Sequence, residues 1–175
     1  MPASKPSLPR SRGFTLIELM IVVSILAVLA TVAGVAFGKY SKIAKSKAAR
    51  AMLLAIAGAE TNEDPYVGSG TSLSFCPPLS TIDSGATAWP SACNSAVWLT
   101  LGIPRPNQTR YAYSINAGAA SDTCAMGVPY CNSVTNGEKW WVAVAHGDLD
   151  GDGIRSTFIT SYSMSGAVYV ANELE

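Results

Sequence analysis

The sequence predicts an α+β protein in which a long N-terminal helix packs on a four-stranded antiparallel sheet. Two observations lead to this prediction. From Leu19 to Phe37 the chain has no charged residue, and a helix of this length would span about 28 Å, close to the ~30 Å hydrocarbon core of a membrane. The region 109–175 instead contains short runs of alternating apolar and polar residues, which are typical of strands.

The first segment, 1–13, is expected to be a processed leader. It contains three prolines and cannot form a stable helix, so it is left out of the fold prediction. The alternative is a secretory signal peptide that is cut after a small residue near Ala30 or Ala33. Glu18 argues against that alternative, because an acid stands where such a signal requires apolar residues.

The run from Arg12 to Leu19, RGFTLIEL, resembles the class III signal sequence of type IV pilins and of the related pseudopilins of type II secretion. The resemblance covers roughly the first 40 residues and implies a type IV pilin-like fold. It also implies that a membrane-embedded prepilin peptidase cleaves after Gly13 and N-methylates Phe14. Glu18 would then be the fifth residue of the mature chain.

After the leader, one long helix is expected from Phe14 to about Ala59, because no proline interrupts this stretch. Its first half, 14–37, should span the membrane and carry assembly. Its second half, 38–60, should be amphipathic and begin the head region, 38–175. The side chains expected to pack on the sheet lie at helical spacing: Tyr40, Ile43, Ala44, Lys47, Ala48, Ala51, Leu54 and Ala55.

Two features of the first half of the helix suggest assembly with other copies. Glu18 is costly in lipid when unpaired, and the amino group of a neighbouring copy's Phe14 would compensate it inside a bundle of helices. The alternative is a carboxylate at the headgroup boundary without a partner. Small side chains let helices approach closely; they are Ala27, Ala30, Ala33, Gly34 and Gly38.

The charges on either side of the apolar run and the leader motif predict opposite orientations in the membrane. Three basic residues precede it and five closely follow it, which by a simple count favours the reverse orientation. The leader motif and the cysteines indicate a cytoplasmic N-terminus, and we give them more weight. We therefore expect a single-pass protein of the bacterial inner membrane that moves to a cell-surface pilus or periplasmic pseudopilus. Without 1–13 the chain has 9 basic and 12 acidic side chains, a net charge of −3, and no nucleic-acid surface is expected.

The four cysteines are expected to form disulfides in an oxidising compartment. No pair has zinc-ligand spacing, and the chain has one histidine. Three connectivities can be drawn among four cysteines. We expect nearest neighbours to pair, Cys76 with Cys93 and Cys124 with Cys131.

The segment 62–108 is rich in Gly, Ser, Thr and Pro and is expected to be one long connecting loop. Within it, Trp89, Trp98 and Leu99 are interpreted as packing anchors. The sheet should then follow in 109–175, with a tight hairpin at 164–166. In the first strand Tyr111, Tyr113 and Ile115 share one face. The four expected strands are 109–116, 140–146, 157–163 and 166–172.

An acidic loop lies between the second and third expected strands. Asp148, Asp150 and Asp152 alternate with other residues and are followed by glycine, a pattern found in the first half of calcium loops. A full EF-hand would require glutamate where the chain has Ile159, so that motif is rejected. The alternatives are a looser calcium site formed by the three aspartates and a plain turn.

No catalytic motif is present, and we expect a structural protein rather than an enzyme. His146 is interpreted as a strand-end residue, not as a base. The resemblance implies a filament of copies of this chain, with prepilin peptidase and an inner-membrane assembly platform as partners. No cofactor is required, apart from the calcium alternative. The acidic loop favours a secretion pseudopilin, the cysteine-bearing loops favour a pilin, and a tethered binding domain that does not polymerise is the third reading.

Overall fold

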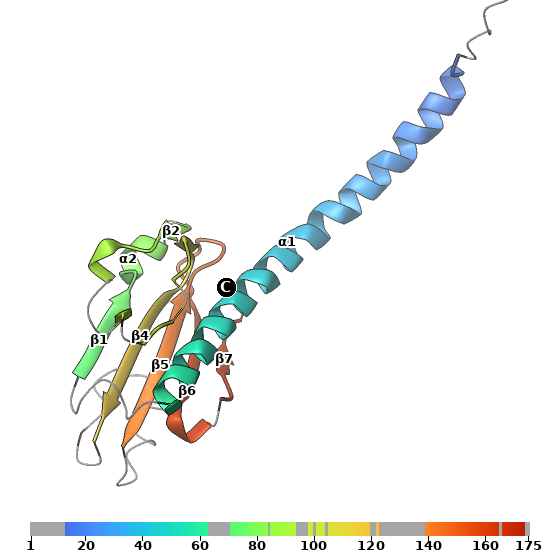
Figure 1. Ribbon diagram of the computed structural model, residues 1–175. Helices are drawn as coiled ribbons and strands as arrows, with labels where there is room; N and C mark the ends of the chain where they lie inside the picture. The colour runs from blue at the N-terminus through green and yellow to red at the C-terminus, as the bar shows by residue number, and fades with distance from the viewer. Residues whose placement is uncertain are drawn as a thin grey trace, which may run out of the picture. The chain divides into compact units, whose positions relative to one another are not determined.

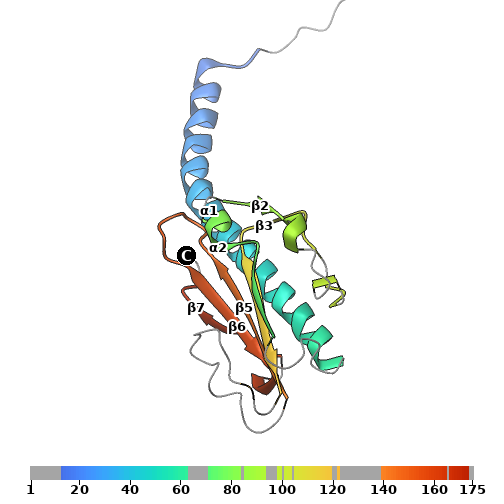
Figure 2. The same cartoon turned by 90° about the vertical axis from the view of Figure 1, so that its left-hand side faces the viewer.

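The computed structural model describes residues 13–62, 71–83, 85–93, 98–99, 101–103, 105–119, 122, 139–164 and 166–173. The chain divides into two compact units, 1–40 and 41–175. Each is treated by itself, and we call the described part of the second unit the head (Figures 1 and 2). Besides the helix α1 (Leu16–Asn62), the elements are β1 (Thr71–Cys76), α2 (Leu79–Ile82), β2 (Thr87–Ala88), the 3₁₀ helix η1 (Ser91–Cys93), β3 (Gln108–Thr109), β4 (Ala112–Gly118), β5 (Trp140–Gly147), β6 (Ser156–Ser161), the 3₁₀ helix η3 (Tyr162–Met164) and β7 (Tyr169–Ala171).

The helix α1 contains, as predicted, a stretch that is long and apolar enough to cross a membrane. It begins and ends slightly later than the predicted 14–59. In the first unit of the chain, the large apolar side chains of α1 are exposed: Ile17 keeps 66% of its surface accessible and Leu29 keeps 60%. These side chains therefore have no packing partner among the described residues.

The α+β fold class is confirmed, but the sheet has five strands rather than four. Its order is β1-β4-β5-β6-β7, all antiparallel, and β2 and β3 form a second, two-stranded sheet (Figure 1). The extra strand β1 lies within 62–108, which was wrongly predicted to be only a connecting loop. It pairs with β4, for example Leu73 with Ile115. Because β4 lies about forty residues later in the chain, its pairing with β1 leaves no local signal in the sequence. The only local indication of β1 is a run of six residues.

The C-terminal strands are shorter than predicted, and the tight hairpin at 164–166 is wrong. The strand β6 ends at Ser161, after which η3 and a further turn lead to β7. The amide of Ala167 donates to the carbonyl of Met164 at 2.8 Å, and the hydroxyl of Thr160 donates to the carbonyl of Ala167 at 2.9 Å. These bonds stabilise a wider connection than the predicted one of three residues.

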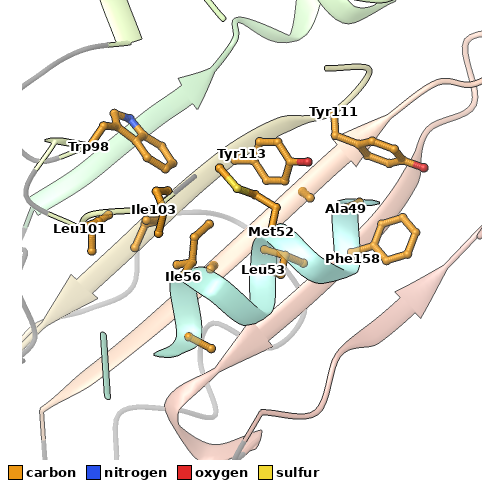
Figure 3. Packing of buried hydrophobic residues seen from close by; sticks show 14 of the residues in the cluster. Ala49, Met52, Leu53, Ile56, Trp98, Leu101, Ile103, Tyr111, Tyr113 and Phe158 are labelled. Atoms are coloured by element: carbon orange, nitrogen blue, oxygen red, sulfur yellow. The ribbon is translucent and has the colours of Figure 1, made fainter. Parts of the chain in front are cut away.

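The side of α1 that packs on the sheet was also predicted wrongly. Ala44, Lys47, Ala48, Ala51 and Leu54 are exposed. The helix instead packs on the sheet with a different face, which includes Met52, Leu53 and Ile56 (Figure 3), and their burial removes apolar surface from water. The buried set is Ser46, Ala49, Met52, Leu53, Ile56, Ala57 and Glu60.

Opposite this face the sheet combines large and small side chains. Tyr111, Tyr113 and Ile115 lie on one face, as predicted, in the same core cluster as the helix residues. In the next strand, Ala145 stands between Tyr113 and Phe158 in the register, and its small side chain leaves room for the helix. The other face of the sheet has its own buried cluster of Trp140, Val142, Val144 and Ile159.

The segment between β1 and β4 is held to the head by aromatic packing and one disulfide. Trp98 is buried in the main core, and its ring meets that of Trp89 edge-on at 5.8 Å, so both are packing anchors as predicted. Leu99 is 48% exposed, so the prediction that it is a packing anchor was wrong. Cys76 and Cys93 form the expected disulfide, with a Cα–Cα distance of 5.7 Å.

Candidate processing and assembly site

The bond between Gly13 and Phe14 lies just outside the long helix. Neither residue is helical, both are exposed, and the helix begins two residues further on at Leu16. Phe14 keeps 87% of its surface accessible. The bond expected to be cleaved is therefore presented in a non-helical segment, where an enzyme can reach the backbone.

Thr15 and Glu18 close the start of the helix with a reciprocal set of hydrogen bonds. The amide and hydroxyl of Thr15 donate to Oε2 of Glu18 at 2.9 and 2.7 Å, and the amide of Glu18 donates to the Thr15 hydroxyl at 3.3 Å. The carbonyl of Thr15 accepts the first helical bond, from Leu19. This is a capping box, which satisfies backbone donors that the helix itself leaves open.

Thr15 is the site residue that the sequence analysis missed. A threonine followed three residues later by glutamate, just before an apolar run, is the pattern that would have identified it. Both hydrogen bonds that the Glu18 carboxylate accepts end on Oε2. Its other oxygen, Oε1, has no hydrogen-bond partner among the described residues. One carboxylate can thus cap its own helix and still accept a bond from a second chain.

The small residues predicted to permit close helix packing all lie on exposed positions of the helix. Apart from the neighbouring backbone of the helix itself, no heavy atom of the described residues comes within 4 Å of the place that a Cβ would take at Gly34 or Gly38. The surface is therefore open to another helix. The remaining members of this set are Ala27, Ala30 and Ala33.

In the head, the loop after β5 brings the three predicted aspartates together. One carboxylate oxygen from each of Asp148, Asp150 and Asp152 lies within 4.8 Å of the others. Asp148 is buried, and its two oxygens accept the amides of Gly151 at 2.6 Å and Gly153 at 2.9 Å. Both glycines have positive φ, 81° and 89°, a conformation that other residues rarely adopt.

A cation from the helix already contacts this loop. Nζ of Lys42 lies 2.7 Å from Oδ2 of Asp150, and this hydrogen bond holds the pKa of the Asp150 carboxyl below its usual value. Asp152 accepts the amide of Ile154 at 2.7 Å. The oxygen ligands and their spacing fit one calcium ion, but such an ion would compete with Lys42. Calcium binding therefore stays a prediction.

His146 lies in β5 with its ring half-buried. Its Nδ1 is 2.9 Å from the hydroxyl of Thr157, and its ring packs on Phe75 with centroids 5.1 Å apart. Burial lowers the pKa of this imidazole. These contacts are those of a strand residue packed against its neighbours. The predicted Cys124–Cys131 disulfide lies outside the described residues.

Comparison with known proteins identifies the N-terminal region. The family model of the prokaryotic N-terminal methylation motif matches residues 8–34, which include Gly13, Phe14 and Glu18. No curated protein and no solved structure matches the chain. The motif, the apolar helix and the α+β head are together consistent with a type IV pilin- or pseudopilin-like prepilin.

Proposed function

We propose that this chain is a structural subunit of a type IV pilus-like filament and not an enzyme. It is inserted in the inner membrane with its N-terminus in the cytoplasm, cleaved after Gly13, N-methylated at Phe14 and polymerised through α1. Its partners are other copies of itself, the prepilin peptidase and an inner-membrane assembly platform. The methylation motif at 8–34 is the observation that supports this most strongly.

The geometry at the start of α1 supports the same proposal. The bond after Gly13 is accessible, and the first unit of α1 exposes apolar side chains that the described chain does not cover. Lipid covers them before assembly and neighbouring helices cover them afterwards. In the filament, the new amino group at Phe14 pairs with Glu18 of a neighbouring copy, and the small side chains allow the helices to approach.

The test is the N-terminal residue and the intact mass of the protein from native membranes and from sheared filaments. A chain that begins with methylated Phe14 establishes processing, and its recovery in the sheared fraction establishes a filament subunit. An uncut chain, or one that begins near Thr31 or Gly34, would contradict the proposal and favour a tethered or secreted binding domain.

The second candidate is a pseudopilin of type II secretion or a minor pilin. The acidic loop, with three carboxylate oxygens within 4.8 Å, favours the pseudopilin, whereas the disulfide Cys76–Cys93 favours a pilin. Deleting the gene distinguishes a pilin from a pseudopilin. Loss of surface fibres identifies a pilin, and loss of enzyme secretion with fibres intact identifies a pseudopilin.

A further inference from the structure

A groove of about 530 Å³ lies between the helix and the segment 105–113 in the head. Apart from Lys45, its helical wall consists of small or apolar side chains, among them Ala48, Ala51 and Met52. Ala48 and Ala51 are two of the positions that the sequence analysis expected to be buried on the sheet. An apolar part of the helix surface thus borders an open groove next to Tyr113 of β4.

The described residues that line this groove include three cations and no carboxylate. Lys45 comes from α1, whereas Arg105 and Arg110 come from the segment around β3, sixty or more residues away in the chain. Arg110 also lines a smaller hollow with Asp83, Asp148 and Asp150, so its charge is shared between the two. The fold therefore brings Arg105 and Arg110 to the groove that Lys45 lines, although they lie far from Lys45 in the sequence.

We propose that this groove binds an anionic phospholipid of the membrane in which the precursor is anchored. This inference rests on the proposed function. The cations suit the phosphate group, and the apolar wall suits the first part of the acyl chains. Lys45 follows Phe37 by eight residues, so the chain holds it within about 29 Å of the end of the apolar run, whatever its path. Basic residues near an anionic membrane surface bind it electrostatically.

A second copy of the chain suits the groove less well. The exposed carboxylates of Asp83, Asp150 and Glu173 are already paired within the head with Arg155, Lys42 and Arg50, at 2.6–2.8 Å. A neighbouring head that offered one of these three acids would therefore have to break the ion pair that the acid already makes. A membrane surface offers phosphate groups at high density, without that penalty.

The test uses the full mature chain in nanodiscs of phosphatidylglycerol and phosphatidylcholine, with retained lipids counted by native mass spectrometry. We expect phosphatidylglycerol to be retained and about fivefold less of it for each of Lys45→Gln and Arg105→Gln. Lys47→Gln is the matched control, because Lys47 is exposed nearby but does not line the groove. Ala48→Trp fills the groove while keeping every charge, and it should lose the lipid too.

Equal retention of the two lipids, an equal loss in Lys47→Gln, or full retention in Ala48→Trp would each overturn the inference. So would an Ala48→Cys variant that reacts with maleimide in phosphatidylglycerol nanodiscs but is protected in filaments, because that assigns the groove to a neighbouring copy. Alkaline extraction separates the two proposals. A chain washed out of native membranes refutes the membrane precursor itself, whereas an embedded chain without bound phosphatidylglycerol refutes only the lipid site.

Discussion

The two units share one helix, yet its side chains have opposite environments. Before residue 41 its large apolar side chains are exposed, as at Leu26 with 57% of its surface accessible, whereas in the head Leu53 and Ile56 are fully buried. The head supplies its own sheet as a packing partner. The N-terminal part of the helix has none among the described residues, and under the proposed function lipid or other chains would cover it. The same secondary structure is thus buried in one unit and exposed in the other.

The largest effect should come from Glu18. Glu18→Ala removes both the helix cap and the charge, whereas Glu18→Gln keeps a side chain that can complete a capping box. We expect both variants to insert in the membrane and both to lose filament incorporation, because the partner amino group needs a charge. Sheared-filament yield measures this. Thr15→Val, which removes only the cap, is the control, and normal filaments from Glu18→Gln would refute the charge pairing.

The comparison between the two units is sharpened by two leucine-to-alanine variants. Leu53→Ala leaves a cavity in the core and should lower the free energy of unfolding by about 4 kcal/mol. Leu26→Ala should leave it unchanged, because Leu26 is 57% exposed among the described residues and is not part of the core. Denaturant unfolding in detergent, followed by tryptophan fluorescence, reports on the head. Equal losses in the two variants would mean that the first unit also packs within its own chain.

The disulfide is a second source of stability that only the head possesses. Cys76 and Cys93 are 17 residues apart, and opening a loop of this size should lower the free energy of unfolding by about 3 kcal/mol. A Cys76→Ser, Cys93→Ser double variant, compared with wild type under oxidising and reducing conditions, measures the loss. Reducing agent should then have less effect on the variant than on wild type. Stability unchanged in the double variant would contradict the prediction.

The ion pair between Asp83 and Arg155 should make the head sensitive to acid. The two hydrogen bonds from Arg155, at 3.0 and 2.6 Å, lower the pKa of Asp83 below its usual value. A carboxyl with a lowered pKa stabilises the fold above the unfolded value near 4, and this contribution is lost as pH falls further. The pair is exposed, so the expected loss is below 1 kcal/mol. Thermal melts from pH 6 to 3 should show a smaller decrease for Asp83→Asn.

Calcium should have the smallest effect. Because Lys42 already contacts Asp150, millimolar calcium should raise the melting temperature of wild type only slightly. Lys42→Ala removes the competing ammonium group and should show a larger rise, and Asp152→Asn in that background should reverse it. Melts with calcium and with chelator provide the measurement. No shift in either wild type or Lys42→Ala would make the loop a plain turn.

The sequence predicted the parts of the fold that have a local signal. The uncharged run predicted the apolar part of α1, and the alternation at 111–115 predicted which side chains of β4 meet the helix. Cys76 and Cys93 paired as nearest neighbours. At the candidate site the motif indicated the residues expected to be processed, but not Thr15, although the spacing of Thr15 to Glu18 is a local signal too.

The predictions that failed concern features that depend on the rest of the fold. The helix in the head has alanine, leucine or methionine on most of its circumference, so periodicity alone cannot select a face. Met52, Leu53 and Ile56 are buried whereas Leu54 is 46% exposed, so the contacts with the sheet, and not side-chain size alone, determine the buried face. The strand β1 owes its existence to β4, about forty residues later. The groove beside Ala48 joins Lys45 to Arg105 and Arg110, and no pattern along the chain brings these together.

The edges of the large sheet have a consequence for crowding. One edge strand, β7, has three residues, and the other, β1, pairs irregularly with β4 between Leu73 and Cys76. Long, regular edges invite strands of other molecules to add to the sheet, and short or irregular ones discourage it. Heads held at high local concentration are therefore expected to stay separate folding units and to resist fusing into amyloid-like aggregates.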